Sequence, residues 1–189
     1  MIRGIDDRNI LDKFIEDFAQ VLERHCKYIV VSGFVAIAHG RTRATEDIDV
    51  IVERLSKEDF EKLFNDLIKS GFECMQSSDP IKVYSDYLNQ DTSVRFTNRE
   101  NFLPPEAELK FAKDELDNLQ LNNRRKLPFT RLDIWFSSVE SNIAFKEEFL
   151  KSDKDIEDAR HLRLVCKGEI DEKEINRIKS LIKKLRLNK

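Results

Sequence analysis

The sequence predicts a mixed α/β fold, in which a β-sheet is flanked by helices. Residues 28–71 show apolar runs of strand length and stretches with helical apolar spacing, in the order strand, helix, strand, helix. Hydrophobic residues form 40% of the chain and include 13 Phe, which supplies a core with a large aromatic share. The 189 residues suit one domain with a small annex, so we expect an α/β core over residues 1–140 and a C-terminal helical region over residues 141–189 packed on it.

Apolar spacing and end signals assign the elements of the first half in order. The predicted elements are a helix over 9–24, a strand over 28–31, a short helix over 34–39 closed by Gly40, a strand over 47–52 and a helix that begins after Ser56 and ends at Gly71. Runs of β-branched residues indicate the strands, and Ser56 with Asp59 resembles a capping box.

The second half continues the sheet and then becomes helical. Further strands are predicted over 72–75, 92–96 and 131–136, and the polar stretch between Pro104 and Leu127 is interpreted as a surface helix and loop inserted between two strands. Ser152 and Asp171 are expected to cap two C-terminal helices, the first of which stops near Gly168.

The charge balance excludes an extensive basic surface, because 33 Lys and Arg stand against 36 Asp and Glu for a net charge of −3. Two basic clusters, at residues 122–126 and 179–189, are either solvated faces or regional contacts for an RNA backbone. The three cysteines lack CxxC spacing, which fits a reducing compartment. No apolar run reaches the roughly 20 residues of a membrane span, and the first residues lack a signal-peptide pattern, so we expect a cytoplasmic protein without a membrane partner.

Asp47 and Asp49 are the most informative residues, because they lie two apart within an apolar strand and therefore project from the same face. Two adjacent carboxylates repel each other and are costly beside a core unless a cation neutralises them. Oxygen ligands suit Mg²⁺ or Mn²⁺, so the pair predicts a divalent metal site. The alternative is that both residues cap a strand at a solvent edge.

Two other segments are candidates for the same site. Asp133 is a lone acid in a predicted strand, and if that strand lies beside Asp47 and Asp49 the three carboxylates could hold two metals for phosphoryl or nucleotidyl transfer. Asp133 could instead pair with Arg131 or another cation. The turn at Ser32 and Gly33 leads from a strand into a helix, where free N–H groups and the helix dipole favour phosphate.

With these motifs in place, the chain resembles the nucleotidyltransferase superfamily typified by DNA polymerase β. The matching segments are VVSGFVAIAHG, RATEDIDVIV and RLDIWF, within residues 28–165. The RxTxDxD form, made by Arg43, Thr45, Asp47 and Asp49, most resembles the minimal nucleotidyltransferases that include AbiEii-type abortive-infection and toxin–antitoxin proteins.

The resemblance implies a mixed-sheet nucleotidyltransferase core and Mg²⁺-dependent transfer of NMP from an NTP, such as ATP, to an acceptor hydroxyl. The acceptor could be RNA such as a tRNA end, a protein or a small molecule, and a toxin–antitoxin partner protein is a further candidate. In this account Asp47, Asp49 and Asp133 are catalytic, and Ser32 and Gly33 hold phosphates. Residues implied to line the nucleotide cleft are Arg43, Lys146, and the Lys-Asp-x-x-Asp stretch with Lys154, Asp155 and Asp158.

Other interpretations stay open at this point. The family's first turn glycine is Ser32 here, and its Cβ is expected to hinder a phosphate, which favours a catalytically idle module that binds nucleotide or protein. A metal-dependent phosphohydrolase ranks last, because the turn before the Asp pair does not support it. Arg43 could be a loop cation bound to Glu46, and the charged residues around Lys146 and Lys154 could be pairs on a wet helical face.

Overall fold

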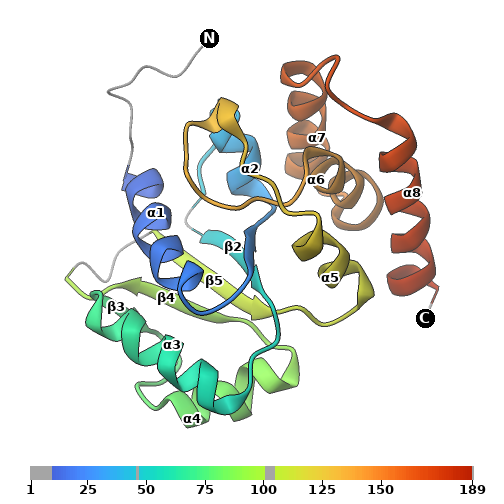
Figure 1. Cartoon of the computed structure of the whole chain (residues 1–189). Coiled ribbons are helices and arrows are strands. Elements are labelled where there is room, and N and C mark those ends of the chain that lie inside the picture. Colours follow the sequence, from blue (N-terminus) through green and yellow to red (C-terminus); the bar gives the residue numbers. More distant parts are fainter. Residues whose placement is uncertain (1–9, 46, 101–104, 189) are drawn as a thin grey trace.

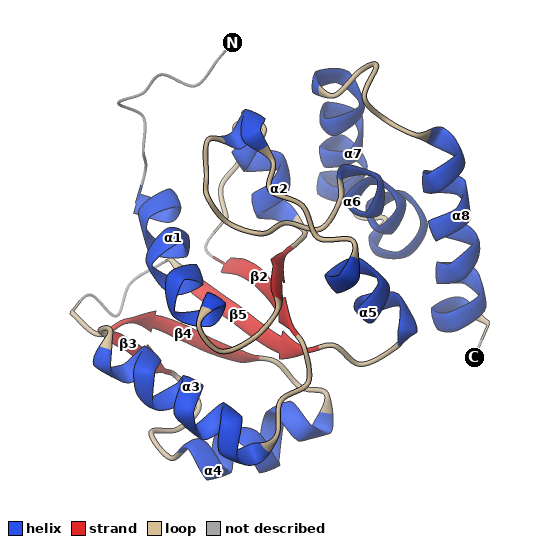
Figure 2. Cartoon of the chain, viewed as in Figure 1, coloured by secondary structure: helices blue, strands red, loops and turns tan. Residues whose placement is uncertain are grey.

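The computed structural model describes residues 10–45, 47–100 and 105–188 and shows a five-stranded mixed sheet surrounded by helices (Figures 1 and 2). The strands are β1 (Tyr28–Val30), β2 (Asp47–Val52), β3 (Phe72–Cys74), β4 (Val94–Asn98) and β5 (Glu106–Phe111). Their order in the sheet is β1-β2-β5-β4-β3, and only the central pair, β2 with β5, is parallel among these described strands. The mixed α/β class predicted from the sequence is confirmed.

Helices connect and cover the strands. They are α1 (Ile10–Glu23), α2 (Gly33–Ala38), α3 (Lys57–Lys69), α4 (Pro80–Lys82), α5 (Glu115–Asn122), α6 (Val139–Phe145), α7 (Asp153–Val165) and α8 (Glu172–Ile182). Shorter helical turns are η1 (Val83–Tyr87), η2 (Leu88–Gln90), η3 (Pro128–Thr130), η4 (Lys146–Leu150) and η5 (Lys183–Leu187). No helix in the described part of the chain is both long enough and apolar enough to cross a membrane.

The main core lies between the sheet and the helices α1 and α3, which Figure 1 shows on the same side of the sheet. The ring of Phe18 on α1 packs edge-on against Phe72 with centroids 5.1 Å apart, and it lies 5.7 Å from Phe96 on β4. Each such buried aromatic side chain contributes about 1.5–3 kcal/mol relative to leaving it exposed. The aromatic share of the composition is therefore concentrated under these two helices.

The end signals read from the sequence operate as expected around α3. The Ser56 hydroxyl accepts a hydrogen bond from the Asp59 N–H at 3.1 Å and donates one to its carboxylate at 2.9 Å, which satisfies an otherwise free N–H of the first turn. At the other end of α3, Gly71 has a φ of +90°, a backbone conformation that residues with a Cβ rarely adopt. β2 spans residues 47–52 as predicted, whereas Asn9, the expected start of the first helix, lies outside the described residues.

The structure corrects two predictions from the second half of the sequence. The interval from Pro104 to Leu127 holds the expected helix as α5, but residues 106–111 ahead of it form the central strand β5; Pro104 itself lies outside the described residues. Residues 131–136, expected to form a strand, contribute only two isolated bridges, a parallel one from Phe136 to Val30 and an antiparallel one from Phe136 to Arg125. Arg131 takes φ 59°, which breaks the extended conformation there.

The C-terminal helices α6, α7 and α8 pack together, and α7 also contacts α2 (Figure 1). The main hydrophobic cluster includes Ala144, Leu162 and Ile178 from these helices together with residues of the sheet. A division of the chain near residue 140 stays a prediction.

Candidate functional site

The parallel pair β2–β5 carries an acidic face. Along each strand every second side chain enters the core, as Ile48 and Ala107 do, and the side chains between them point to the opposite face. Asp47 lies opposite Glu106 in the β2–β5 register. Asp49 lies opposite Glu108. We call these four carboxylates the acid face.

Within the acid face, Asp49 has a raised pKa. Burial is the main cause, and the nearby charges of Glu108 and Asp47 add to it. Lys110 and a hydrogen bond from the Ser32 side chain act in the opposite direction without cancelling the rise. The ionised form of Asp49 is therefore destabilised in the folded protein, and a cation bound beside it would reduce this destabilisation.

Arg95 of β4 partly neutralises the acid face. Its guanidinium nitrogens lie 3.7 Å from Asp47, 3.7 Å from Glu106 and 3.5 Å from Glu108. These distances are long for hydrogen bonds, and the Arg95 side chain is 45% exposed, so the arrangement is a loose ion cluster at the mouth of the face. Among the residues described, no group of three His, Cys, Asp or Glu side chains converges closely enough to hold a metal ion as it stands.

The structure does not bring Asp133 to the acid face. Its side chain is 95% exposed and forms an ion pair with Lys126 at 2.9 Å. The segment that follows it runs along the outer side of β1, where the Val30 N–H donates to the Trp135 carbonyl at 2.8 Å. Because β1 separates this segment from β2, the strand beside Asp47 and Asp49 is β5. Glu106 and Glu108 were not among the predicted site residues, although the alternation in EAELKF is a strand signal.

The turn at Ser32 and Gly33 links the acid face to a second charged group. Ser32 has φ 65° and ψ −132°, a conformation that residues with a Cβ seldom adopt. Its N–H donates to Asn142 Oδ1 at 3.0 Å, so this donor of the turn is already engaged. A Cβ added at Gly33 would lie 3.1 Å from the guanidinium carbon of Arg43. The group that a Cβ at residue 33 would crowd is therefore the Arg43 guanidinium.

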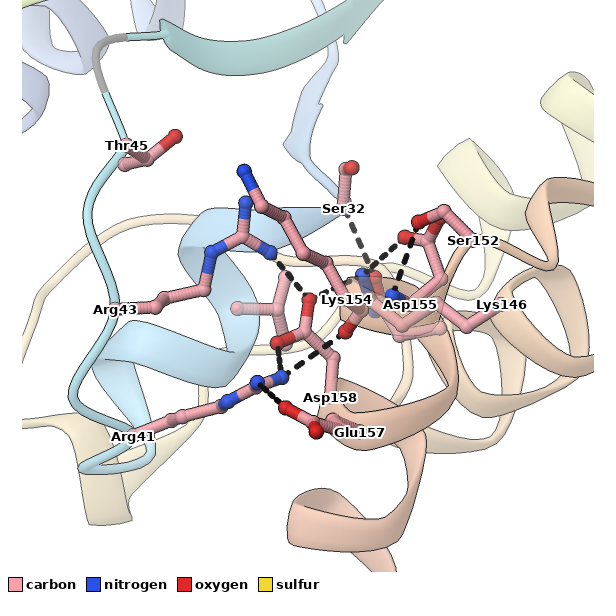
Figure 3. Close-up of polar contacts among 12 residues, drawn as sticks. Ser32, Arg41, Arg43, Thr45, Lys146, Ser152, Lys154, Asp155, Glu157 and Asp158 are labelled. Atoms are coloured by element: carbon pink, nitrogen blue, oxygen red, sulfur yellow. Dashed lines mark hydrogen bonds and ion pairs between the residues drawn. The ribbon is translucent and has the colours of Figure 1, made fainter.

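The second group, shown in Figure 3, is centred on Asp158, whose side chain is 0% exposed. Lys146 Nζ donates to Asp158 Oδ2 at 2.7 Å, and Arg43 donates to the same oxygen at 2.5 Å. Arg41 binds the other oxygen, and Lys146 also donates to Asp155 at 3.1 Å. We call Arg41, Arg43, Lys146, Asp155 and Asp158 the Asp158 cluster.

The Asp158 cluster contains four of the residues predicted for a nucleotide cleft, namely Arg43, Lys146, Asp155 and Asp158. Lys146 is only 1% exposed, and its ion pairs with Asp155 and Asp158 offset the cost of burying its ammonium. Lys154 differs: its carbonyl accepts a hydrogen bond from Arg41 at 3.0 Å, while its side chain is exposed. Glu46, the alternative partner of Arg43, lies outside the described residues.

Burial raises the pKa of Asp155, but hydrogen bonds from Ser152 and Lys146 outweigh it and leave the pKa below its usual value. Asp155 is therefore held as a carboxylate. Arg41, which sequence analysis did not select, binds Asp158 and also Glu157 at 2.7 Å. Its only sequence signal is its place two residues before Arg43.

A cavity of about 120 Å³ lies between the acid face and the C-terminal helices. Asp49 and Lys110 line it from the sheet, Gln120 from α5, Asn142 and Lys146 from the α6–η4 helix, and Arg186 from η5. The aromatic side chains of Phe145 and Phe149 complete the wall. The cavity therefore joins one acid of the acid face to one cation of the Asp158 cluster.

Comparison with known proteins identifies the fold. No model of a protein family and no curated protein sequence matches the chain. Among solved structures, the chain is similar to the solution structure of the antibiotic-resistance factor ANT(2'')-Ia, with a TM-score of 0.54 and 12% identity over 94% of both chains. It is also similar to the crystal structure of ANT(2'')-Ia in complex with adenylyl-2''-tobramycin, with a TM-score of 0.53 and 14% identity over 93% of this chain and 98% of that one. The chain thus has a nucleotidyltransferase-like fold, as predicted.

Proposed function

We propose that this protein is a metal-dependent nucleotidyltransferase, which transfers a nucleoside monophosphate from a nucleoside triphosphate to an acceptor hydroxyl. The observation that carries the proposal is the acid face: β2 and β5 present Asp47, Asp49, Glu106 and Glu108 in register beside a cavity. The fold supports it, because ANT(2'')-Ia is an aminoglycoside nucleotidyltransferase.

The donor chemistry of the acid face fits a divalent cation. Mg²⁺ usually takes one or two carboxylates and completes its shell with waters and substrate phosphates, so Asp47 and Asp49 would hold Mg²⁺ or Mn²⁺ without three converging acids. A bound ion of this kind polarises a phosphoryl oxygen. Glu108 lies opposite Asp49 in the sheet and adds to the rise in its pKa, so Glu108 is the acid placed to orient the Asp49 carboxylate. Asp133 has no part in this proposal.

The Asp158 cluster and the turn would receive the triphosphate. Arg43 and Lys146 would counter its charge, and Asp158 would hold both cations in place. Ser32 and Gly33 would lie against the phosphates, and Lys154 would add an exposed cation at the edge of the cleft.

The acceptor is the open part of the proposal. The adenylyl-2''-tobramycin complex of ANT(2'')-Ia supports a small molecule with a free hydroxyl. The RxTxDxD resemblance supports instead an RNA or protein acceptor, in a toxin–antitoxin or defence setting. The two classes differ enough in size for one experiment to separate them.

The test is to incubate the protein with each α-labelled NTP, Mg²⁺ and either aminoglycosides, total RNA or a protein extract, and to follow the label. We expect label to enter one of these pools with the wild-type protein and not with Asp49→Asn. Transfer by Asp49→Asn at the wild-type rate would overturn the proposed role of the acid face.

One observation favours a second candidate, a catalytically idle module that binds nucleotide or protein. Arg95 lies within 3.5–3.7 Å of three acids of the acid face and neutralises part of their charge without a metal. Titration calorimetry with NTP, with and without Mg²⁺, separates the two. An enzyme should bind NTP more tightly with Mg²⁺, whereas nucleotide heat that is independent of Mg²⁺ and unaccompanied by transfer would favour the idle module.

A further inference from the structure

Lys110 is a cation without a partner beside the acid face. It lies on β5 two residues after Glu108, so it projects from the same face, and it lines the cavity with Asp49. Within the described part of the chain, its ammonium makes neither a hydrogen bond nor an ion pair; it acts on Asp49 only electrostatically. A half-buried ammonium without a partner is costly, so this group is poised to bind an anion.

The other cations that line the cavity already have carboxylate partners. Lys146 binds Asp155 and Asp158. The Arg186 guanidinium donates to Asp114 at 2.9 Å and 3.1 Å, and to Asp117 at 2.6 Å. Lys110 is therefore the cavity-lining cation, among described residues, whose charge is not compensated by an ion pair.

Gln120 supplies a second group without a partner in the same cavity. It is 5% exposed, and its side chain makes no hydrogen bond to any residue that the structure describes. Since every fully enclosed polar side-chain atom in the described residues has a partner, the amide of Gln120 reaches the cavity surface. A buried amide that keeps both donor and acceptor capacity is a ready contact for a polar ligand.

We propose that Lys110 and Gln120 form a subsite for a phosphate group of the substrate. The ammonium would pair with the phosphate charge, and the amide would donate to a phosphate oxygen. The cavity of about 120 Å³ is several times the roughly 30 Å³ share of one water molecule, which leaves room for such a group next to Asp49. The assignment of the phosphate to a nucleotide rests on the proposed function; the subsite itself does not.

The test measures inorganic pyrophosphate binding by titration calorimetry in the presence of Mg²⁺. We expect Lys110→Met to weaken binding at least tenfold and Gln120→Leu to weaken it severalfold. Lys113→Met is the matched control, because Lys113 is exposed three residues further along and does not line the cavity. The melting temperature of each variant, measured alongside, distinguishes a loss of binding from a loss of folded protein.

Unchanged binding in Lys110→Met, or no pyrophosphate binding by the wild-type protein, would overturn the subsite. Competition identifies the source of the phosphate: displacement of pyrophosphate by NTP assigns it to the nucleotide, and simultaneous binding assigns it to a phosphorylated acceptor. Failure of the subsite is distinct from failure of the proposed function. Wild-type label transfer with Lys110-independent pyrophosphate binding overturns only the subsite, and Lys110-dependent binding without transfer overturns only the enzyme.

Discussion

At the scale of single residues, Gly33 leaves room for Arg43, whose guanidinium carbon lies 3.1 Å from the position that a Cβ at residue 33 would occupy. Gly33→Ala should push the Arg43 guanidinium away by a few tenths of an ångström and strain its ion pair with Asp158. We expect the free energy of unfolding to fall by about 1 kcal/mol, the low end of the usual cost of overpacking, because the guanidinium ends a flexible side chain. Urea denaturation measures this loss.

A double-mutant cycle supplies the control for this prediction. In an Arg43→Ala background the clash is absent, so Gly33→Ala should cost much less there than in the wild type. Equal costs in both backgrounds would show that the strain at residue 33 arises from the backbone and not from Arg43.

Asp49 gives a prediction about pH. Its pKa in the folded protein is raised, mainly by burial, so the folded state binds a proton that the unfolded state releases above about pH 4. The ionised carboxylate therefore destabilises the fold at neutral pH, and Asp49→Asn should raise the melting temperature at pH 7 in EDTA.

The same linkage fixes where this gain disappears. Below about pH 4 the carboxyl is protonated in both states, so the gain from Asp49→Asn should shrink towards zero as the pH falls from neutral through the folded pKa to that range. Melting curves between pH 3 and 7 measure it. A gain that is constant over this range, or a lower melting temperature at pH 7, would contradict the assigned electrostatics.

At the scale of elements, ion pairs of Arg186 join η5 to the start of α5. Its guanidinium binds Asp114 and the buried Asp117, and it lies 5.1 Å from the centre of the Phe145 ring. Arg186→Met should lower the free energy of unfolding by about 2–3 kcal/mol, because it leaves buried carboxylates without their cation. Denaturant unfolding measures the loss.

Lys183 of the same turn provides the control. Its side chain is 58% exposed and lies 3.7 Å from Glu148, so Lys183→Met should change the free energy of unfolding by less than about 0.5 kcal/mol. Comparable losses in the two variants would mean that η5 as a whole, and not the Arg186 contacts, stabilises this region.

The difference between β2 and β5 explains which elements the sequence predicted. β2 carries the continuous β-branched run Val50-Ile51-Val52 directly after Asp49, so local pattern was sufficient to place it at residues 47–52. β5 alternates Glu106, Glu108 and Lys110 with apolar residues, and its charges lie on the cleft side. The high polarity of the segment indicated a surface helix, whereas the alternation of its polar and apolar residues indicates a strand.

At the scale of the whole molecule, the turn at residues 32–33 lies between two charged groups that come from distant parts of the chain. The Ser32 side chain forms a hydrogen bond with Asp49 of the acid face, and Gly33 lies close to the guanidinium of Arg43 in the Asp158 cluster. Arg41 and Asp158 meet across 117 positions in the sequence. Such contacts depend on sheet order and helix packing, which local patterns do not specify.

The same limit explains the misplaced third acid. Local pattern placed Asp47 and Asp49 on one face, but which strand lies beside them follows from the crossover of the chain. Asp133 and Glu108 were both available from composition, and only the sheet order puts Glu108 opposite Asp49.

Label transfer from an α-labelled NTP, measured on three matched variants, decides whether the acid face performs nucleotidyl transfer. We predict that Asp49→Asn and Glu108→Gln lower the transfer rate at least about 100-fold, because both remove charge from the site where a metal and a phosphate would meet. Asp133→Asn should keep the wild-type rate, because its side chain is 95% exposed and bound to Lys126. Loss of transfer in Asp133→Asn together with full transfer in Glu108→Gln would show that the acid face is not the catalytic site.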